Sequence, residues 1–394
     1  MDYLQINTDS ELQQLCGLLA SEPIIAFDTE FVSEYTYRPQ LCLIQVAAGK
    51  HLAIIDTLSV KDLSPFWNLL ATGDGCTIVH AGREEVGFSL TAIGEVPARL
   101  FDVQIAAGLI GLEYPASYRS LSKKLLNQNP AKEESRTDWR RRPLTERQQK
   151  YALDDVLYLA DMHQKLIDRL TELGRMTWLE DEMSSWLGQV RFAYKRQRWR
   201  RVSGIGGLSA RSKAIVRELW FWRESEAEKK NIPVRRVLRD DLIVEIAKRQ
   251  SSDPTRIAAL RGMDRNDLQR VLPELSACVE KALRLEAAEL PTSRRPGNMP
   301  PQINMLGQLI SSALNSVCRQ AHLAPSLVGN PSDVRDLIAF KLGRAKNDEQ
   351  APMLAQGWRQ EVVGSLIDDL LSGTVAVRIS DPHSEHPLSL DPID

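Results

Sequence analysis

The chain has 394 residues, of which 43% are hydrophobic and 26% charged, as in soluble globular proteins, and its length predicts two or three domains. The formal net charge of −2 excludes a uniformly basic nucleic-acid coat, although Lys and Arg can still gather in local patches. No apolar run approaches the roughly 18 residues of a membrane span, and the N-terminus lacks a signal-peptide pattern. The five cysteines are scattered and form no C-x-x-C pair, so we expect a cytoplasmic protein with free thiols and no zinc.

Strand and helix patterns alternate from the N-terminus to about residue 170. Ser10 is expected to cap a first amphipathic helix, and Thr145 a long helix over residues 146–170. Strands are predicted at residues 24–27, 41–47, 51–55, 77–79 and 99–102. The first three are joined by short connections, which favours antiparallel pairing. This order predicts an α/β core of the ribonuclease-H-like type.

Strand patterns nearly vanish after the glycine-rich residues 203–207. Two sets of amphipathic helices follow, separated by a proline-bearing linker at residues 291–301. Ser209 and Ser332 are expected to cap helices, and Gly373 to end the last one. The two sets resemble each other in length and helix order, which indicates a divergent repeat. The polar residues 381–394 are expected to be loose.

Two acids follow the apolar run at residues 24–27 directly. Asp28 and Glu30 are two residues apart, so in a strand their side chains project to the same face. Neighbouring carboxylates at the end of a buried strand repel each other unless a cation lies between them. Oxygen ligands favour Mg²⁺ or Mn²⁺. The alternative is a strand that ends in a solvated acidic loop.

A second group of candidate residues lies on the long predicted helix. Tyr151 and Asp155 are four residues apart and therefore stack on one face, whereas Asp154 is rotated away by roughly 100°. A carboxylate there can bind a metal while the phenol holds a water. The alternative is a core tyrosine beside an exposed acid.

These motifs resemble those of a known enzyme family. Asp28-x-Glu30, the His80-to-Glu85 segment and Tyr151-x-x-x-Asp155 are similar, in order, to the three motifs of the DEDD exonucleases in their tyrosine variant. Residues 133–139 and 142–147 add the pattern of the ribonuclease D family. The resemblance covers nearly the whole chain.

The resemblance implies an α/β ribonuclease-H-like exonuclease domain at residues 1–202, followed by two small all-α HRDC (helicase and RNase D C-terminal) domains. Their bounds would be 208–288 and 302–375, with a C-terminal tail at 376–394. It implies a 3′→5′ exoribonuclease that uses two divalent ions, Mg²⁺ or Mn²⁺, and releases nucleoside 5′-monophosphates. The expected partners are RNA 3′ ends, including tRNA precursors, with no membrane and no obligate protein partner.

The family's roles can be transferred residue by residue. Asp28, Glu30 and Asp155 would be metal ligands, and Tyr151 would position water. The second motif normally ends in Asp, whereas this chain has Glu85, which is one methylene longer and puts the second metal in question. Two further positions, His80 and Asp102, are expected to be structural residues at strand–helix junctions.

Substrate contacts are predicted from residues near these motifs. Phe31 follows the acid pair and could wedge against the terminal base, and Trp199 lies in a cationic segment where it could stack on a base. The candidate phosphate ligands are Arg136, Arg140, Arg141 and Arg142. Gln45, in an apolar strand, is expected to satisfy buried polar groups.

Two other functions stay open from the sequence. One is a 3′→5′ exonuclease of single-stranded DNA, because contacts to the RNA 2′-hydroxyl are not visible in a sequence. The other is an RNA-binding relative weakened in catalysis by Glu85. If the helical half only holds substrate, deleting residues 209–394 should leave a nuclease active on short single strands.

Overall fold

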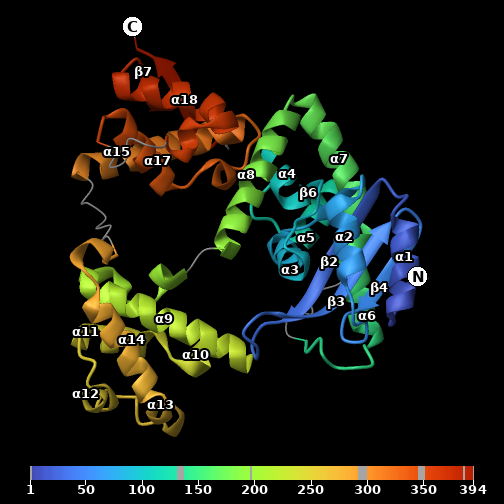
Figure 1. The fold of residues 1–394 in the computed structure, drawn as a ribbon. Helices are drawn as coiled ribbons and strands as arrows, with labels where there is room; N and C mark the ends of the chain where they lie inside the picture. Colours follow the sequence, from blue (N-terminus) through green and yellow to red (C-terminus); the bar gives the residue numbers. More distant parts are fainter. Residues whose placement is uncertain are drawn as a thin grey trace. The chain divides into compact units, whose positions relative to one another are not determined.

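The computed structural model describes residues 2–130, 137–195, 198–291, 300–344, 351–384 and 387–393 (Figure 1). The chain forms two compact units. Unit 1 comprises Met1–Glu30, Cys42–Tyr194 and Asn298–Asp394, and unit 2 comprises Phe31–Leu41 and Lys195–Gly297. Within the described ranges, no helix is both long and apolar enough to cross a membrane.

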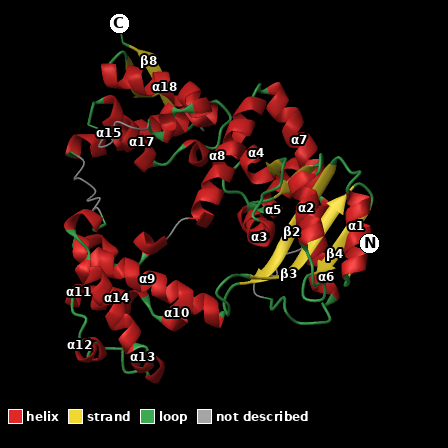
Figure 2. Ribbon diagram, in the orientation of Figure 1, coloured by secondary structure: helices red, strands yellow, loops and turns green. Residues whose placement is uncertain are grey.

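Unit 1 is built on a six-stranded mixed sheet with the order β1-β4-β3-β2-β5-β6 (Figure 2). The strands are β1 (Leu4–Ile6), β2 (Ile24–Val32), β3 (Gln40–Ala48), β4 (His51–Asp56), β5 (Cys76–Val79) and β6 (Leu100–Asp102). β3 and β4 pair antiparallel, as predicted, whereas β1 with β4, β2 with β5 and β5 with β6 pair parallel. The sequence pattern did not predict β1, which has only three residues.

Helices cover both faces of this sheet. On one face, Phe27 of β2 contacts Phe66 and Trp67 of α2 (Ser64–Thr72) edge-on, with ring centroids 5.7 and 5.9 Å apart. On the other, Ala26 belongs to the core formed with the later helices. These are α4 (Val103–Leu109), α5 (Tyr118–Leu126), α6 (Glu146–Leu157), α7 (Leu159–Glu172) and α8 (Met176–Lys195). By strand alternation, Asp28 shares the face of Ala26.

The first helix, α1 (Asp9–Leu19), begins two residues earlier than the predicted cap implies. Thr8, not Ser10, is the N-cap: its side chain accepts from the Glu11 N–H, and Glu11 reaches back to the Thr8 N–H. This reciprocal pair is a capping box, which satisfies two backbone donors where a single serine satisfies one.

The predicted long helix is interrupted at Tyr158 and forms two helices, α6 and α7. Its N-terminus is as predicted, because Thr145 caps α6 in a capping box with Gln148. At the break, the Tyr118 hydroxyl donates to the Asp154 carbonyl at 2.6 Å and accepts from the Tyr158 N–H at 3.3 Å. A side-chain hydroxyl thus occupies the place of a helical hydrogen bond, which is a recognised cause of helix kinks.

The C-terminal segment of unit 1 packs against the α/β core. It contains α15 (Pro301–Gln320), α16 (Pro325–Val328), α17 (Pro331–Lys341), η4 (Met353–Ala355), α18 (Gly357–Ser372), β7 (Val375–Ile379) and β8 (Leu388–Pro392). Asn330, not Ser332, caps α17, and Gly373 ends α18 as predicted. The loose tail expected at residues 381–394 is wrong for its described part, because β8 pairs antiparallel with β7.

Unit 2 is helical in its described part from residue 198 to 291 (Figure 2). Its elements are η1 (Arg198–Arg201), η2 (Ile205–Gly207), α9 (Ala210–Lys230), α10 (Val234–Val237), α11 (Asp240–Arg249), α12 (Pro254–Ala258), α13 (Asn266–Arg270), α14 (Leu272–Arg284) and η3 (Ala287–Glu289). Ser209 caps α9, as predicted. The connection between β2 and β3 belongs to this unit: the Tyr37 hydroxyl donates to Glu224 on α9 at 3.1 Å.

Candidate active site

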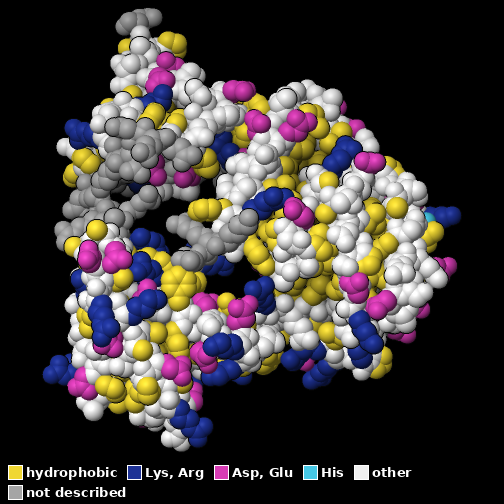
Figure 3. Space-filling model, in the orientation of Figure 1, with side chains coloured by type: hydrophobic (Ala, Val, Ile, Leu, Met, Phe, Trp, Pro, Cys, Tyr) yellow, Lys and Arg dark blue, Asp and Glu magenta, His cyan; other side chains and the backbone are white. Residues whose placement is uncertain are grey.

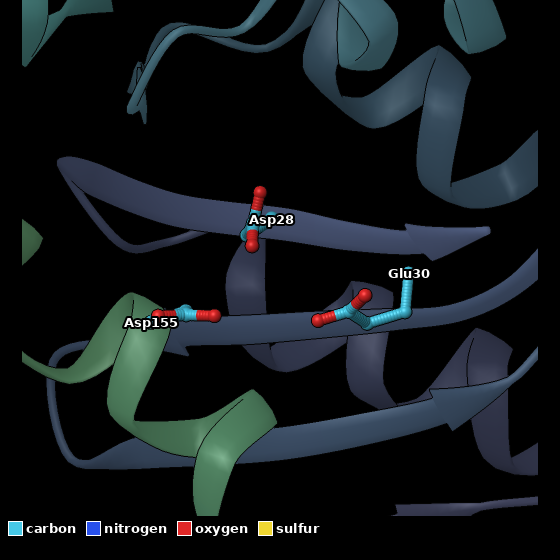
Figure 4. A group of neighbouring side chains, drawn as sticks. All are labelled: Asp28, Glu30 and Asp155. Carbon is cyan, nitrogen blue, oxygen red and sulfur yellow. The ribbon is translucent and has the colours of Figure 1, made fainter. Parts of the chain in front are cut away.

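Three carboxylates from two elements meet in unit 1. Asp28 and Glu30 come from β2, and Asp155 comes from α6, which packs on the sheet face that bears them. One carboxylate oxygen of each lies within 4.8 Å of the other two. Figure 4 shows Asp155 extending from its helix toward the two side chains of the strand. We call these three residues the acid cluster.

The acid cluster is electrostatically crowded. Burial, together with the charges of Asp155 and Glu85, raises the pKa of Glu30 to about 9. Burial, Glu85, Asp155 and Glu30 together raise the pKa of Asp28 well above its ordinary value. Buried carboxylates this close together are stable only when they are protonated or when a cation lies between them. The all-oxygen donor set therefore fits a hard divalent cation.

Gln45 of β3, the strand beside β2 in the sheet, contacts the acid cluster. Its side chain is fully buried, and its Nε2 donates to Asp28 Oδ2 at 3.2 Å. This confirms the expectation that Gln45 satisfies a buried polar group. The donated hydrogen bond orients the Asp28 carboxylate, which is the usual task of a residue behind a metal ligand.

Glu85 lies near the acid cluster but is not one of its three members. It is buried on α3 (Arg83–Ile93) and accepts a hydrogen bond from the Thr29 hydroxyl at 2.6 Å. Burial raises its pKa to about 7, although the hydrogen bond from Thr29 opposes this shift. Its neighbour Glu84 is exposed. The longer side chain is thus held by the threonine that separates Asp28 from Glu30 in sequence.

Tyr151 faces the acid cluster from α6. Burial and the charges of Asp155 and Glu30 raise the pKa of its phenol, as does a hydrogen bond to Asp155. The phenol therefore stays protonated at neutral pH and can donate a hydrogen bond. Its ring lies against the buried indole of Trp139, with centroids 6.1 Å apart.

Comparisons with known proteins show which family this fold and sequence match. A family model described as 3′-5′ exonuclease matches residues 3–171, and one described as HRDC domain matches residues 212–279. Ribonuclease D of Nitrobacter hamburgensis is 30% identical over 95% of this chain and 96% of its own length, and that of Pseudomonas paraeruginosa is 32% identical over 92% and 96%. The solved structure of Escherichia coli RNase D covers 95% of this chain and 99% of its own, with 30% identity and a TM-score of 0.81.

The chain belongs to the ribonuclease D family. It is a hydrolytic 3′→5′ exoribonuclease of the divalent-metal-dependent type, with an α/β exonuclease domain and an HRDC domain. The fold brings the acids of the three sequence motifs close to one another on one face of the sheet.

Two of the predicted substrate contacts are not supported by the structure. Trp199 is only 6% exposed and packs in the core of unit 2, so it offers no free face for a base. Although Trp199 lies in a cationic stretch of sequence, its indole is buried among apolar side chains that include those of α9. The guanidinium of Arg142 is engaged with Asp56 of β4 instead of projecting freely toward a phosphate.

The remaining candidates differ in exposure. Arg141 is 85% exposed, whereas Arg140 forms a bidentate pair with Asp138 at 2.8 and 2.9 Å. Phe31 is half-buried at the end of β2, and Arg136 lies outside the described residues. On the face shown in Figure 3, basic and acidic side chains are interspersed, in agreement with the absence of a uniform basic coat there.

The two junction residues of the ribonuclease D motifs have structural contacts. Asp102 caps α4 and accepts from the backbone N–H groups of Ala81 and Gly82, at 3.1 and 2.9 Å. His80 Nε2 lies 2.9 Å from the Ala116 carbonyl oxygen. Sequence reasoning missed Thr29 and Trp139, because their contacts with Glu85 and Tyr151 depend on which distant elements pack together.

Proposed function

We propose that Asp28, Glu30 and Asp155 bind two Mg²⁺ or Mn²⁺ ions and that Glu85 supports the second of them. The observation that carries this proposal is the convergence of the three carboxylates within 4.8 Å. Two dications close together repel each other, so several carboxylates are needed to offset their charge. The buried charge of Glu85 lies near enough to raise the pKa of Asp28.

The protein's own side chains would divide the work of phosphodiester hydrolysis. When bound, the divalent ions make water a better nucleophile at neutral pH and neutralise charge on the phosphate and the leaving 3′-oxygen. Tyr151, protonated at neutral pH, donates its one phenol hydrogen to Asp155, which fixes the direction of the phenol, and the phenol oxygen can then accept a hydrogen bond from the attacking water and orient it. Gln45 keeps Asp28 in place.

The natural substrates we propose are structured RNAs with 3′ extensions, including tRNA precursors. The E. coli relative is described as an exoribonuclease involved in structured RNA processing. In this chain, the exposed Arg141 lies in the segment that leads into α6 and can contact phosphate there.

We also propose that the described part of residues 302–375 forms a second, divergent HRDC-like domain. Four of its helices follow the order of four in the first domain, which has the short α12 and α13 in addition: a long helix, a four-residue helix, a medium helix and a final long one. The corresponding pairs are α9 and α15, α10 and α16, α11 and α17, and α14 and α18. The family model for HRDC supports only the first of the two, at residues 212–279.

The proposal can be tested with purified protein and a 5′-labelled tRNA precursor that carries a 3′ extension. In Mg²⁺ or Mn²⁺, we expect a ladder that shortens from the 3′ end and stops near the mature terminus, and no reaction in EDTA. A single-stranded DNA of the same sequence tests the alternative substrate. Cleavage that is equally fast on DNA, or that persists in EDTA, would contradict the proposal. The Asp155→Asn protein is the matched control.

A further inference from the structure

The segment that leads into α6, residues 137–145, is anchored to the sheet by Arg142. Its Nε and Nη2 donate to the two carboxylate oxygens of Asp56, at 2.5 and 2.8 Å. Nη2 also donates to the Cys42 carbonyl on β3 at 3.0 Å. Asp56 is the last residue of β4, and its side chain is only 6% exposed. A planar guanidinium suits this bidentate pair, and its remaining N–H groups can donate to nearby carbonyl oxygens at the same time.

The Asp56 carboxylate is held in its charged form by these contacts. Burial raises the pKa of Asp56, but the hydrogen bonds from Arg142 and from the Leu58 N–H outweigh it and hold the pKa below its ordinary value. The ion pair is thus a fixed, partly buried contact and not a passing surface encounter.

The same guanidinium reaches the residue that packs on Tyr151. Arg142 Nη1 donates to the Trp139 carbonyl at 2.8 Å. Trp139 is buried, and its indole lies against the Tyr151 ring at 6.1 Å with the planes tilted by 36°. The contacts therefore run without interruption from the end of β4, through Arg142 and Trp139, to the phenol beside the acid cluster.

We propose that Asp56, Arg142 and Trp139 are positioning residues that fix the Tyr151 phenol for catalysis. The inference rests on the proposed role of Tyr151. It assigns Arg142 a different task from the phosphate contact that its sequence position predicts, because its donors are directed at Asp56, Cys42 and Trp139. A displacement of about 1 Å at a reacting group can lower a rate about 100-fold, so a rigid support here has a catalytic consequence.

The test compares three variants, Arg142→Lys, Asp56→Asn and Trp139→Phe, on a short 3′-tailed RNA. Each should lower kcat by about 10- to 100-fold, as removal of a supporting residue does elsewhere, and leave KM within about twofold of wild type. Arg169→Lys is the matched control, because this exposed arginine forms an ion pair on α7 and should leave kcat unchanged. Thermal melting checks folding. If the ion-pair variants unfold, Trp139→Phe still tests the contact that positions Tyr151, because it leaves Asp56 and Arg142 intact.

The Tyr151→Phe protein separates this inference from the proposed function. If Tyr151→Phe lowers kcat and the Trp139→Phe/Tyr151→Phe double variant is no slower, Trp139 acts through the phenol as proposed. If the losses in the double variant multiply, the positioning role is overturned. It is also overturned if Arg142→Lys raises KM with kcat unchanged while Asp56→Asn changes neither KM nor kcat, and Arg142 is then a substrate contact. If Tyr151→Phe turns over like wild type, the role of Tyr151 itself is wrong.

Discussion

Asp155 is the member of the acid cluster that α6 contributes, and its charge can be removed with almost no change in shape. Asp155→Asn should lower RNA hydrolysis in Mg²⁺ by more than about 100-fold, because a direct metal ligand should cost at least as much as the supporting residues do. Tyr151→Phe should be milder, since the three carboxylates remain. Initial rates on 3′-labelled RNA measure both effects, with circular dichroism as the folding control. Near-normal turnover of Asp155→Asn would contradict the metal assignment.

Glu85 is the residue at which this chain departs from the motif of its relatives. If its carboxylate serves the second metal, Glu85→Gln should reduce turnover by about 10-fold or more, and Glu85→Asp should be tolerated or faster in Mg²⁺. Mn²⁺ should help the wild type more than the Asp variant, because its coordination geometry is less demanding. Rates in both metals give the comparison. Equal rates for all three proteins would show that Glu85 supports only Thr29.

The raised pKa values predict how the metal-free protein responds to pH. With a pKa of about 9 in the folded state against an ordinary 4.5, Glu30 keeps a proton that the unfolded chain releases. The stability that protonated Glu30 contributes is therefore fully present below pH 4.5 and is lost as the pH rises from 4.5 to about 9. In EDTA, the melting temperature should fall between pH 6 and pH 9, and Glu30→Gln should show a smaller fall.

Metal binding should respond to the same protons in the opposite sense. Since the ligands must be deprotonated, the increase in melting temperature on adding Mg²⁺ should grow from pH 6 to pH 9. Differential scanning calorimetry at fixed ionic strength measures it, with Asp28→Asn as the control that should show little increase at any pH. An increase that is independent of pH would mean that the acid cluster is already ionised without metal.

The sequence predicted which acids come together, whereas two of the predicted substrate contacts, Trp199 and Arg142, are engaged elsewhere. Asp28 and Glu30 could be found because strand alternation is local, and Tyr151 and Asp155 because helical spacing is local. Arg142 could not be assigned correctly, because its partner Asp56 lies 86 residues away in sequence and a guanidinium suits phosphate and carboxylate equally.

At the scale of elements, local signals predicted the strands of the sheet core and two of the four expected helix N-caps, Thr145 and Ser209. The break after α6 escaped prediction, because the hydroxyl that causes it comes from Tyr118 on another helix. Of the hairpin strands, β7 is rich in β-branched residues and could have been predicted, whereas its partner β8 has few such residues and ends in Asp391 and Pro392. Thr8 could have been preferred to Ser10, since Thr8 and Glu11 have the spacing of a capping box.

A buried ion pair joins two helices of unit 1 and gives the element-scale prediction. Glu182 on α8 accepts from Arg359 on α18 at 2.6 and 2.9 Å and also from the Trp358 indole at 3.0 Å. Glu182→Ala should cost about 3–5 kcal/mol of unfolding free energy, because it leaves Arg359 buried and uncompensated. Urea unfolding measures the loss. The exposed Glu180→Ala is the control and should change stability by less than about 0.5 kcal/mol.

At the scale of the whole molecule, the C-terminal segment is part of the compact unit that holds the acid cluster. Arg175, beside α8, donates to the carbonyls of Leu109 on α4 and of His322 after α15, both at 2.7 Å. The Ala324 N–H donates to the Gly108 carbonyl at 2.8 Å. The sequence showed the helices but not this packing, because nothing local distinguishes a docked helical segment from a tethered one.

This packing changes the outcome expected from truncation. Ending the chain after Pro291 should expose the apolar faces of α4 and α8, remove Arg359 from Glu182, and leave Arg175 with the Leu109 carbonyl but without that of His322. A loss of several kcal/mol would lower the melting temperature of unit 1 by roughly 10 °C or more, with increased binding of a hydrophobic dye and lower activity even on short RNA. Ending the chain after Gly373 removes only the β7–β8 hairpin and should have little effect. If the shorter protein melted like the full chain and digested short RNA at the same rate, residues 300–393 would be a dispensable module, as the sequence pattern alone suggests.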